Sequence, residues 1–336
     1  MPKTIPKLAD PATIQEAANL LRQGRLVAFP TETVYGLGAD ASNPEAVNKI
    51  FSAKGRPVDH PLIVHIADPI QLSDWAVDIP EAAYQLAKQF WPGPLALILN
   101  KKPSVPLAVT GGQNTVAVRI PQHPVALQLL QSFGGGVAAP SANRYCRISP
   151  TTAQHVLEEL GDAVDFILDG GACAVGVEST IIDLSGTQPR LLRPGHIRYP
   201  QIEAILNTPV KLPEMTTNDS ESAASTLRAP GMMALHYAPE TKALLCSADE
   251  LSARIKTLQA TTQHIGLLCY QSSINANSKL TIITLPAQAD AYAQGLYAAL
   301  RQLDELKLDL LLIECPPDNE AWRAVNDRLH KATARY

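Results

Sequence analysis

Apolar residues recur along the chain with two different periods, and each period predicts a different kind of element. The apolar face of the first predicted helix, 11–23, consists of Ile14, Ala17, Ala18 and Leu21. This i, i+3, i+4, i+7 spacing places all of them on one side of a helix. Asp10 followed by Pro11 is typical of a helix start, and Gly24 is typical of a helix end. The pattern therefore predicts one bounded amphipathic helix near the N-terminus.

Short apolar runs rich in β-branched residues alternate with such helices over the first 210 residues. Strands are expected at 26–30, 62–66, 95–99, 115–120, 136–139, 166–168, 180–184 and 190–192. Further helices are expected at 43–55, 81–90, 124–132 and 151–160. This alternation predicts a large, twisted mixed sheet with helical cover, in an α/β (α+β) domain.

Residues 213–230 are small, polar and without period, which indicates an exposed linker. Beyond it, strands are expected at 243–246, 265–270, 280–285 and 308–314, and helices at 249–259, 290–304 and 320–333. We therefore divide the chain into a first domain (1–212), a linker (213–239) and a small Rossmann-like α/β C-terminal domain (240–336). The C-terminal domain lacks G-x-G-x-x-G, so its fold class does not imply dinucleotide binding.

Composition narrows the class of protein further. A chain of 336 residues predicts about two domains, and 46% hydrophobic against 18% charged residues predicts globular folding. The net charge of -4 argues against a protein that coats nucleic acid or an anionic membrane through bulk charge, so any anion site must be local. The five cysteines form no C-x-x-C pair, and no apolar stretch is long enough to cross a bilayer. We expect a soluble, cytoplasmic protein.

Polar and cationic residues gather where predicted strands and helices end. These are the segments 31–35, 54–56 and 141–143, together with Arg119 and Arg193. Cations from separate strand ends converge at low cost only around an anion, because like charges repel and desolvated cations are unstable. Arg suits bidentate recognition of phosphate or carboxylate, and Lys supplies a point charge. The pattern predicts an α/β protein that binds a polyphosphate or carboxylate ligand.

Taken singly, these residues also have simpler interpretations. A lone cation at a strand end is usually solvated, S-x-N is a common turn, and His65 within PLIVHI would by default be a core histidine. Cys146 and Cys173 are most simply small inert residues. The chain has no Walker A sequence, no H-E-x-x-H and no G-x-S-x-G, so the usual NTPase, zinc-protease and hydrolase signatures are missing.

With those residues in place, the sequence closely resembles the YrdC-like L-threonylcarbamoyladenylate synthase family in its longer, two-domain form. The matching blocks are PTETVYGLGADA (30–41), KGRPVDHPLIVHI (54–66), FWPGPLALIL (90–99), TVAVRIPQHP (115–124), APSANRYCRISPTTA (139–153), GVESTIIDL (176–184) and LLRPG (191–195). The segment APGMMALHYAP (229–239) resembles the family's linker, whereas the C-terminal domain matches only by position and class.

The resemblance implies a nucleotidyltransferase that condenses L-threonine, bicarbonate and ATP to L-threonylcarbamoyl-AMP and pyrophosphate. A separate tRNA threonylcarbamoyl transferase complex would then modify the adenosine beside the anticodon. Block by block, the implied catalytic residues are Lys54 and Arg56. The implied ATP-binding residues are Arg56, His60, Thr115, Ala139, Ser141, Asn143, Ser149, Arg193 and Tyr237. The implied threonine-binding residues are Thr33, His65, Arg119 and Ser179.

Physical chemistry agrees with these implied roles. Arg119 can hold a carboxylate in bidentate fashion, while Thr33 or His65 can bond the threonine hydroxyl and so select against valine. Lys54 and Arg56 would stabilise charge that develops on the phosphates. Mg²⁺ is expected to arrive with ATP, held mainly by substrate oxygens and water, without an organic cofactor. Because the carbamate intermediate is labile in water, we expect the linker to act as a lid.

Two positions depart from the family pattern, and two other functions compete. His60 stands where the family usually has Asn, and Cys146 where it usually has Gly. An RNA-binding module without catalysis is an alternative, although the acidic net charge and 5% aromatic content disfavour strong nucleic-acid binding. A carbamoyltransferase of the hydrogenase-maturation type would need zinc-finger cysteine pairs, which the sequence lacks.

Overall fold

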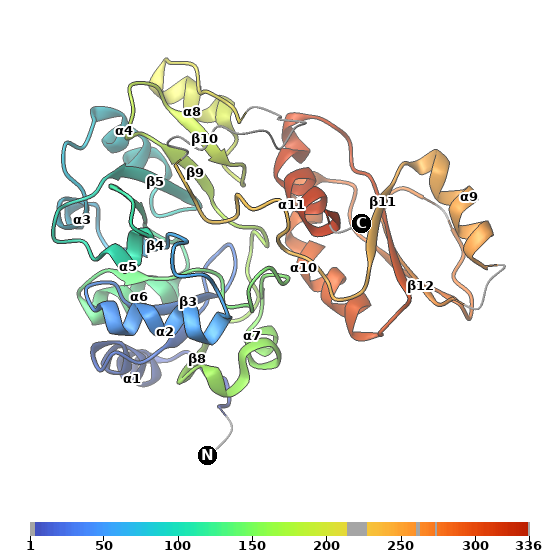
Figure 1. The fold of residues 1–336 in the computed structure, drawn as a ribbon, viewed down its shortest axis with the longest axis horizontal. Coiled ribbons are helices and arrows are strands. Elements are labelled where there is room, and N and C mark those ends of the chain that lie inside the picture. The colour runs from blue at the N-terminus through green and yellow to red at the C-terminus, as the bar shows by residue number, and fades with distance from the viewer. Residues whose placement is uncertain (1–3, 214–226, 260–262, 273, 335–336) are drawn as a thin grey trace.

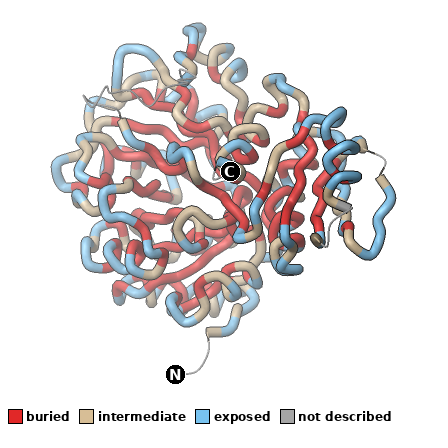
Figure 2. The backbone as a smooth tube through the Cα atoms, turned by 45° about the vertical axis from the view of Figure 1, so that its right-hand side comes forward, coloured by how far each residue is buried: buried red, intermediate tan, exposed pale blue. Residues whose placement is uncertain are grey.

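Two β-sheets, each with its own helices, lie side by side in the computed structural model of the chain (Figure 1). The structure describes residues 4–213, 227–259, 263–272 and 274–334. The first sheet has ten strands and precedes the linker, whereas the second has four parallel strands and follows it. Buried backbone is concentrated in the strands of both sheets (Figure 2). This is the predicted fold class, a mixed α/β domain followed by a Rossmann-like unit.

The first sheet brings distant segments of the chain into one surface. Its strands are β1 (Lys7–Leu8), β2 (Val27–Phe29), β3 (Gly36–Asp40), β4 (Ile63–His65), β5 (Leu95–Asn100), β6 (Thr115–Arg119), β7 (Val137–Ala138), β8 (Phe166–Asp169), β9 (Thr180–Asp183) and β10 (Arg190–Arg193). Their spatial order is β1-β8-β2-β3-β7-β4-β6-β5-β9-β10, with parallel and antiparallel neighbours mixed. Because β4 and β6 are parallel, His65 lies directly opposite Arg119.

Helices cover both faces of this sheet. They are α1 (Pro11–Arg22), α2 (Pro44–Lys54), α3 (Leu72–Trp75), α4 (Glu81–Phe90), α5 (Leu107–Thr110), α6 (Pro124–Phe133), α7 (Ala153–Leu160) and α8 (Tyr199–Leu206), with short 3₁₀ turns η1 (Pro69–Gln71) and η2 (Gly161–Ala163). Helices α1 and α6 pack on the face that carries Val27 and Phe29. Helices α2, α4 and α7 share the opposite core with Leu26 and Ala28, as strand alternation requires.

Capping residues set the ends of the two helices that flank the polar loops. The Asp10 side chain accepts the N–H of Thr13 at the start of α1, and Asn43 caps α2 in the same way. Gly55 ends α2 in the left-handed conformation, with φ of 62°. Both helices were predicted from these residues. The end of α2 at Gly55 fixes the positions of Lys54 and Arg56.

Strand β3 is an element that the sequence pattern did not predict. It lies within GLGAD, whose glycines disfavour a strand on propensity alone. A Cβ atom at Gly38 would lie 2.9 Å from both the Phe29 ring and the Val137 side chain, so only glycine fits between the neighbouring strands. The short elements β1, α3 and α5, and the helix α8, were not predicted either.

The C-terminal unit is a layered α/β structure. Its strands are β11 (Ala243–Cys246), β12 (Ile265–Cys269), β13 (Leu280–Thr284) and β14 (Leu310–Glu314), in the order β11-β14-β12-β13. Helix α9 (Ala248–Gln259) packs on the face formed by Ile265 and Leu267. Helices α10 (Ala289–Glu305) and α11 (Arg323–Thr333) cover the other face, between this sheet and the first domain (Figure 1). The predicted helix 320–333 begins as a 3₁₀ turn, η3 (Glu320–Trp322).

The linker connects the two units across their shared interface. Of the predicted linker 213–239, residues 214–226 lie outside the described residues. Residues 227–239 cross the first domain near the ends of its strands and lead into β11. Within the described part of the chain, no helix combines the length and apolar character needed to cross a membrane.

Candidate functional site

Strand ends and loops of the first sheet surround a cavity with about 540 Å³ of empty space, open solvent at its mouth included. The polar residues that line it are Thr31, Thr33, Arg56, His65, Arg119, Ser141, Glu178, Ser179, Arg193, His236 and Tyr237. Thr33 follows β2, His65 ends β4 and Arg119 ends β6. The register of β4 with β6 therefore explains why residues far apart in the sequence meet here.

The structure brings most, but not all, of the predicted site residues to this cavity. Those that line it are Thr33, Arg56, His65, Arg119, Ala139, Ser141, Ser179, Arg193 and Tyr237. Lys54, Asn143 and Ser149 are buried beside it, and His60 lines an adjoining cavity that shares Arg56, Gly231 and His236 with the first. Thr115 starts β6, at the opposite end of that strand from Arg119.

Three cations in or beside the cavity have only neutral hydrogen-bond partners among the described residues. Arg56 donates from Nη2 to the Pro61 carbonyl at 3.1 Å. Arg193 donates to the Ser179 carbonyl, the Ser179 hydroxyl and the Pro230 carbonyl at 2.9, 3.1 and 3.1 Å. Lys54 donates to the Ser141 and Asn143 carbonyls. Since all of them are buried, their positive charge is well placed to receive an anion.

The pKa directions report how strongly these cations are desolvated. Burial, and the neighbouring Arg56, lower the pKa of Lys54 well below its usual value. Burial also lowers the pKa of Arg56 to about 10, with a further contribution from Arg193. The pKa of Arg193 is lowered by burial and by the cations around it. A bound polyanion would reverse these shifts, so binding such a ligand relieves an existing electrostatic cost.

The inner part of the cavity carries groups suited to a small polar ligand. Arg119 donates to the Thr33 hydroxyl at 3.1 Å and forms a 2.6 Å ion pair with Glu32. Thr33 also shares a 2.8 Å hydrogen bond with Thr31. His65 is buried, and burial followed by Arg119 lowers its pKa to about 3, so the imidazole is neutral. Its Nδ1 atom has no partner among the described residues and is available to a ligand.

Glu178 is a lining residue to which the sequence analysis gave no role. It lies within the GVEST block, next to Ser179, and is only 5% exposed. Burial by itself would raise the pKa of Glu178, but Arg328, Arg193 and hydrogen bonds from Ser149 and Arg328 outweigh that effect and lower it to about 2. Ser149, predicted beside the nucleotide, here donates to Glu178 at 2.5 Å. The signal that could have identified Glu178 was its position directly before Ser179, a predicted site residue.

The described linker residues close one side of the cavity. Gly231 and Tyr237 both line it, and a Cβ atom at Gly231 would lie 2.2 Å from the Tyr237 hydroxyl. Tyr237 has a left-handed backbone, with φ of 61°, and its buried hydroxyl has no partner among the described residues. His236, also in the lining, belongs to the linker that was expected to cover the site, although it was given no individual role. This strained and unsatisfied arrangement is typical of a segment that contacts ligand.

The two departures from the family pattern have distinct surroundings. His60 lines the adjoining cavity, and its ring meets that of Tyr145 edge-on, with 5.6 Å between the ring centres. Burial and Arg56 lower the pKa of His60, which favours its neutral form. Cys146 has a φ of 63°, a conformation that glycine adopts without strain and cysteine does not. The substitution at 146 therefore costs backbone energy in the loop that follows Asn143.

Fold and site together define a two-domain α/β protein with a cation-rich cavity at the strand ends of its first sheet. The family described as Telomere recombination matches residues 19–195, and the family described as Threonylcarbamoyl-AMP synthase, C-terminal domain, matches residues 197–334. The chain belongs to the YrdC-like threonylcarbamoyl-AMP synthase family, in its two-domain form.

Individual relatives agree with this family over nearly the whole chain. The threonylcarbamoyl-AMP synthase of Bacillus subtilis is 44% identical over 95% of this chain and 92% of its own length. That of Pyrococcus abyssi is 42% identical over 95% of this chain and 94% of its own length. The crystal structure of P. abyssi Sua5 complexed with L-threonine superposes with a TM-score of 0.91, at 40% identity over 98% of each chain.

Proposed function

We propose that this chain is an L-threonylcarbamoyladenylate synthase, a nucleotidyltransferase that uses L-threonine, bicarbonate and ATP. The observation that carries the proposal is the set of buried cations Lys54, Arg56 and Arg193, which have no acidic partner among the described residues. The family and its threonine-bound structural relative support the same substrate class. A triphosphate supplies the negative charge that this cluster lacks.

The reaction divides into two bond-forming steps. The threonine amine attacks the bicarbonate carbon, and loss of water leaves a carbamate. A carbamate oxygen then attacks the α-phosphorus of ATP, and the bond to pyrophosphate breaks, which yields L-threonylcarbamoyl-AMP. Arg56 and Arg193 would stabilise the negative charge that accumulates on the phosphates, and Lys54 would add to their field. No covalent intermediate on the protein is required.

The inner residues would select and orient threonine. The guanidinium of Arg119 presents N–H groups toward a carboxylate, while Thr33, His65 and Ser179 offer partners for the ammonium and hydroxyl groups. The neutral imidazole of His65 can accept or donate, according to its tautomer. Valine would leave these polar groups without partners, and that unpaired burial provides the discrimination.

ATP would enter as its Mg²⁺ complex, with the metal carried by substrate oxygens and water. Two acidic side chains lie in or beside the cavity, and both are engaged: Glu178 accepts from Ser149, and Glu32 pairs with Arg119. They do not fit a protein-held Mg²⁺ site. Mg²⁺ would therefore belong to the nucleotide substrate and not to the protein.

The linker would serve as a lid that keeps water away from the carbamate. Gly231, His236 and Tyr237 already lie over the cavity. The product would pass to a tRNA threonylcarbamoyl transferase complex in the cytoplasm. Limited proteolysis with and without L-threonine and ATP tests the lid, since ligand should protect bonds in residues 227–239; equal cleavage rates would contradict it.

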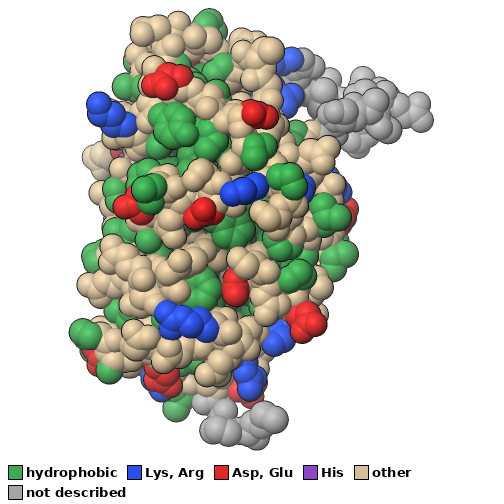
Figure 3. All heavy atoms as spheres, turned by 90° about the vertical axis from the view of Figure 1, so that its left-hand side faces the viewer, with side chains coloured by type: hydrophobic (Ala, Val, Ile, Leu, Met, Phe, Trp, Pro, Cys, Tyr) green, Lys and Arg blue, Asp and Glu red, His purple; other side chains and the backbone are tan. Residues whose placement is uncertain are grey.

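A nucleic-acid binder without catalysis is the competing function. On the face of the molecule shown in Figure 3, basic and acidic side chains are interspersed rather than gathered by sign. The net charge is -4. That face offers no continuous basic surface of the kind that follows a phosphate backbone.

Pyrophosphate release by the purified chain tests the proposal directly. L-threonine, ATP and bicarbonate are supplied together, and each is then omitted in turn, with L-serine and L-valine replacing L-threonine in parallel reactions. We expect release that depends on all three substrates and is strongest with L-threonine. No release under any condition would contradict a synthase, and measurable tRNA affinity would then favour the binder.

A further inference from the structure

Glu178 is held by the C-terminal domain as well as by its own. Its Oε1 atom accepts the hydroxyl of Ser149 at 2.5 Å. Its Oε2 atom accepts Tyr297 Oη of α10 at 2.9 Å and Arg328 Nε of α11 at 2.7 Å. These last two donors lie 119 and 150 residues further along the chain. The second domain thus supplies two of the contacts that fix a carboxylate in the wall of the cavity.

Arg328 is a meeting point of several site segments. Its side chain is fully buried, and Nη2 donates to the Pro194 carbonyl at 3.1 Å. Its guanidinium lies 5.0 Å from the centre of the Tyr237 ring. One turn further along α11, Lys331 donates to the Gly231 carbonyl at 2.7 Å. Helix α11 therefore contacts the GVEST loop, the LLRPG loop and the linker at once.

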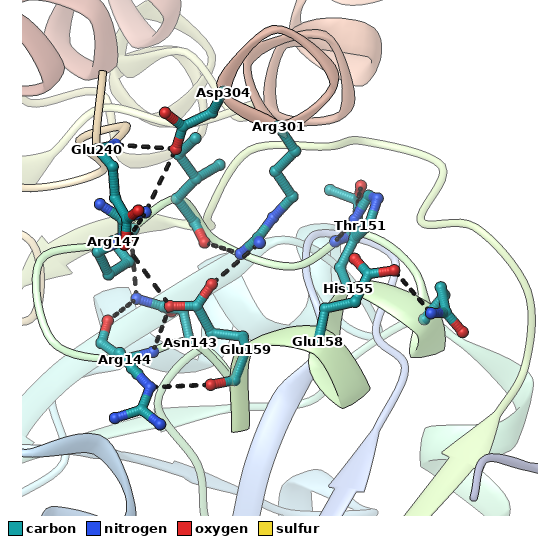
Figure 4. Close-up of polar contacts among 12 residues, drawn as sticks. Asn143, Arg144, Arg147, Thr151, His155, Glu158, Glu159, Glu240, Arg301 and Asp304 are labelled. Atoms are coloured by element: carbon teal, nitrogen blue, oxygen red, sulfur yellow. Dashed lines mark hydrogen bonds and ion pairs between the residues drawn. The ribbon is translucent and has the colours of Figure 1, made fainter. Parts of the chain in front are cut away.

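Helix α10 makes a parallel connection to the loop that carries Asn143 and Ser149. Arg301 reaches from α10 to Glu159 at 3.0 Å and to the Ile148 carbonyl, and Asp304 pairs with Arg147 at 3.3 Å (Figure 4). The loop at Arg147 and Ile148, and the helix α7 that follows it, are thus tied to the second domain. These contacts are mostly between charged, largely buried side chains, so they fix the relative positions of the groups they join.

The charge of Glu178 makes its position important. Arg193 also lines the cavity, and the two groups interact electrostatically. Without Arg328, Glu178 would be a buried carboxylate short of its main counter-ion, and Arg193 is the cation available to replace it. An Arg193 neutralised in this way would attract phosphate less, and the carboxylate would repel it.

We propose that Arg328, assisted by Tyr297, is a positioning residue that keeps the Glu178 carboxylate paired with the C-terminal domain instead of with Arg193, so that Arg193 stays available to the ATP phosphates. This inference rests on the proposed function. It gives the C-terminal domain a specific role, because that domain supplies the counter-ion that sets the charge balance of the nucleotide site, although Arg328 itself touches no substrate.

The test combines single and double variants in the full-length chain. Arg328→Met should raise the KM for ATP about tenfold or more, with a smaller change in the KM for L-threonine. Adding Glu178→Gln removes the carboxylate charge that has lost its Arg328 counter-ion. The double variant should therefore recover an ATP KM within about threefold of the parent. A purely structural role for Arg328 predicts no recovery, and that result would overturn the proposal.

Controls separate this effect from loss of folding. Arg323→Met makes the same substitution at the start of α11, where Arg323 contacts Glu320 and the Tyr199 ring, and should leave both KM values unchanged. Tyr297→Phe removes only one hydroxyl and should raise the ATP KM severalfold without changing the thermal midpoint by more than a few degrees. Folded Arg328→Met and Tyr297→Phe proteins with the parent's ATP KM would also refute the inference.

Failure of the proposed function gives a different signature. ATP affinity is measured in parallel by calorimetry, which needs no turnover. A parent chain that binds ATP but releases no pyrophosphate would contradict the synthase, while the order of ATP affinities, parent above Arg328→Met and the double variant restored, would still support the positioning role. Equal affinities in all of them would overturn it.

Discussion

The ammonium of Lys54 lies 2.5 Å from the carbonyl oxygen of Ser141, although 87 residues separate them in the sequence. The same ammonium donates to the Asn143 carbonyl. The last residue of α2 is thereby tied to the S-A-N turn, and the ammonium is buried beside the cavity rather than placed in its lining. Lys54 thus holds the S-A-N turn in position as well as carrying charge.

Lys54→Ala should abolish most pyrophosphate release and also reduce stability. Loss of the ammonium leaves two buried carbonyl groups without their donor, at a cost of about 1–3 kcal/mol. Lys49→Ala is a matched control, because Lys49 lies on the same helix and also donates to a backbone carbonyl, that of Gly24 at 2.7 Å. Lys49→Ala should reduce stability without reducing pyrophosphate release by the folded protein. Urea denaturation and the release assay separate the two effects; full turnover by Lys54→Ala would contradict the role.

Thr33→Val should weaken the selection of threonine over valine by about tenfold or more. The substitution keeps the shape of the side chain but removes the hydroxyl that accepts from Arg119 at 3.1 Å. The measurement is kcat/KM for both amino acids at saturating ATP. Thr187→Val, at an exposed loop position, is the control and should keep the parent's ratio. An unchanged ratio in Thr33→Val would rule out this residue as a selector.

Gly231→Ala should impair both stability and catalysis. Gly231 has φ of 82°, and an added Cβ would approach the Tyr237 hydroxyl to 2.2 Å. The linker would have to shift away from the cavity, at a cost of about 1–3 kcal/mol and with a higher KM for L-threonine and for ATP. Gly186→Ala adds its Cβ in open space and should change neither property. Thermal denaturation and steady-state kinetics provide the comparison.

Lowering the pH should reduce the free energy of unfolding already at pH values well above the usual pKa of carboxylates. Burial, as the largest cause, lowers the pKa of both His65 and His236 to about 3. In the unfolded chain these groups bind protons below about pH 6.5, and the folded chain does not. The free energy of unfolding should therefore fall as pH decreases from about 6.5, by up to about 1.4 kcal/mol per pH unit for each histidine.

Urea denaturation between pH 7 and pH 5 checks this prediction. Glu178 does not affect the free energy of unfolding in this pH range. Its lowered pKa contributes stability that is lost only as pH falls from about 4.5 to about 2. His236→Asn should reduce the slope by the share of one histidine. A flat profile across this window in the parent would contradict the buried neutral histidines.

Sequence alone determined the elements whose signals are local. Asp10 and Asn43 start helices, and Gly55 ends one, because capping depends on hydrogen bonds within a few residues. Clustered polar residues at strand ends predicted an anion site, because desolvated cations need compensation wherever the chain places them. The motif blocks then supplied residue roles that periodicity could not.

Only the tertiary structure decided which of those residues meet. Strand β3 exists because Gly38 fits between Phe29 and Val137, a contact invisible to strand propensity. The partnership of Glu178 with Arg328 spans 150 residues and depends on how two domains pack. The neutral state of His65 likewise follows from burial opposite Arg119. Burial and long-range pairing set charge and position, and neither is encoded in any short stretch of the chain.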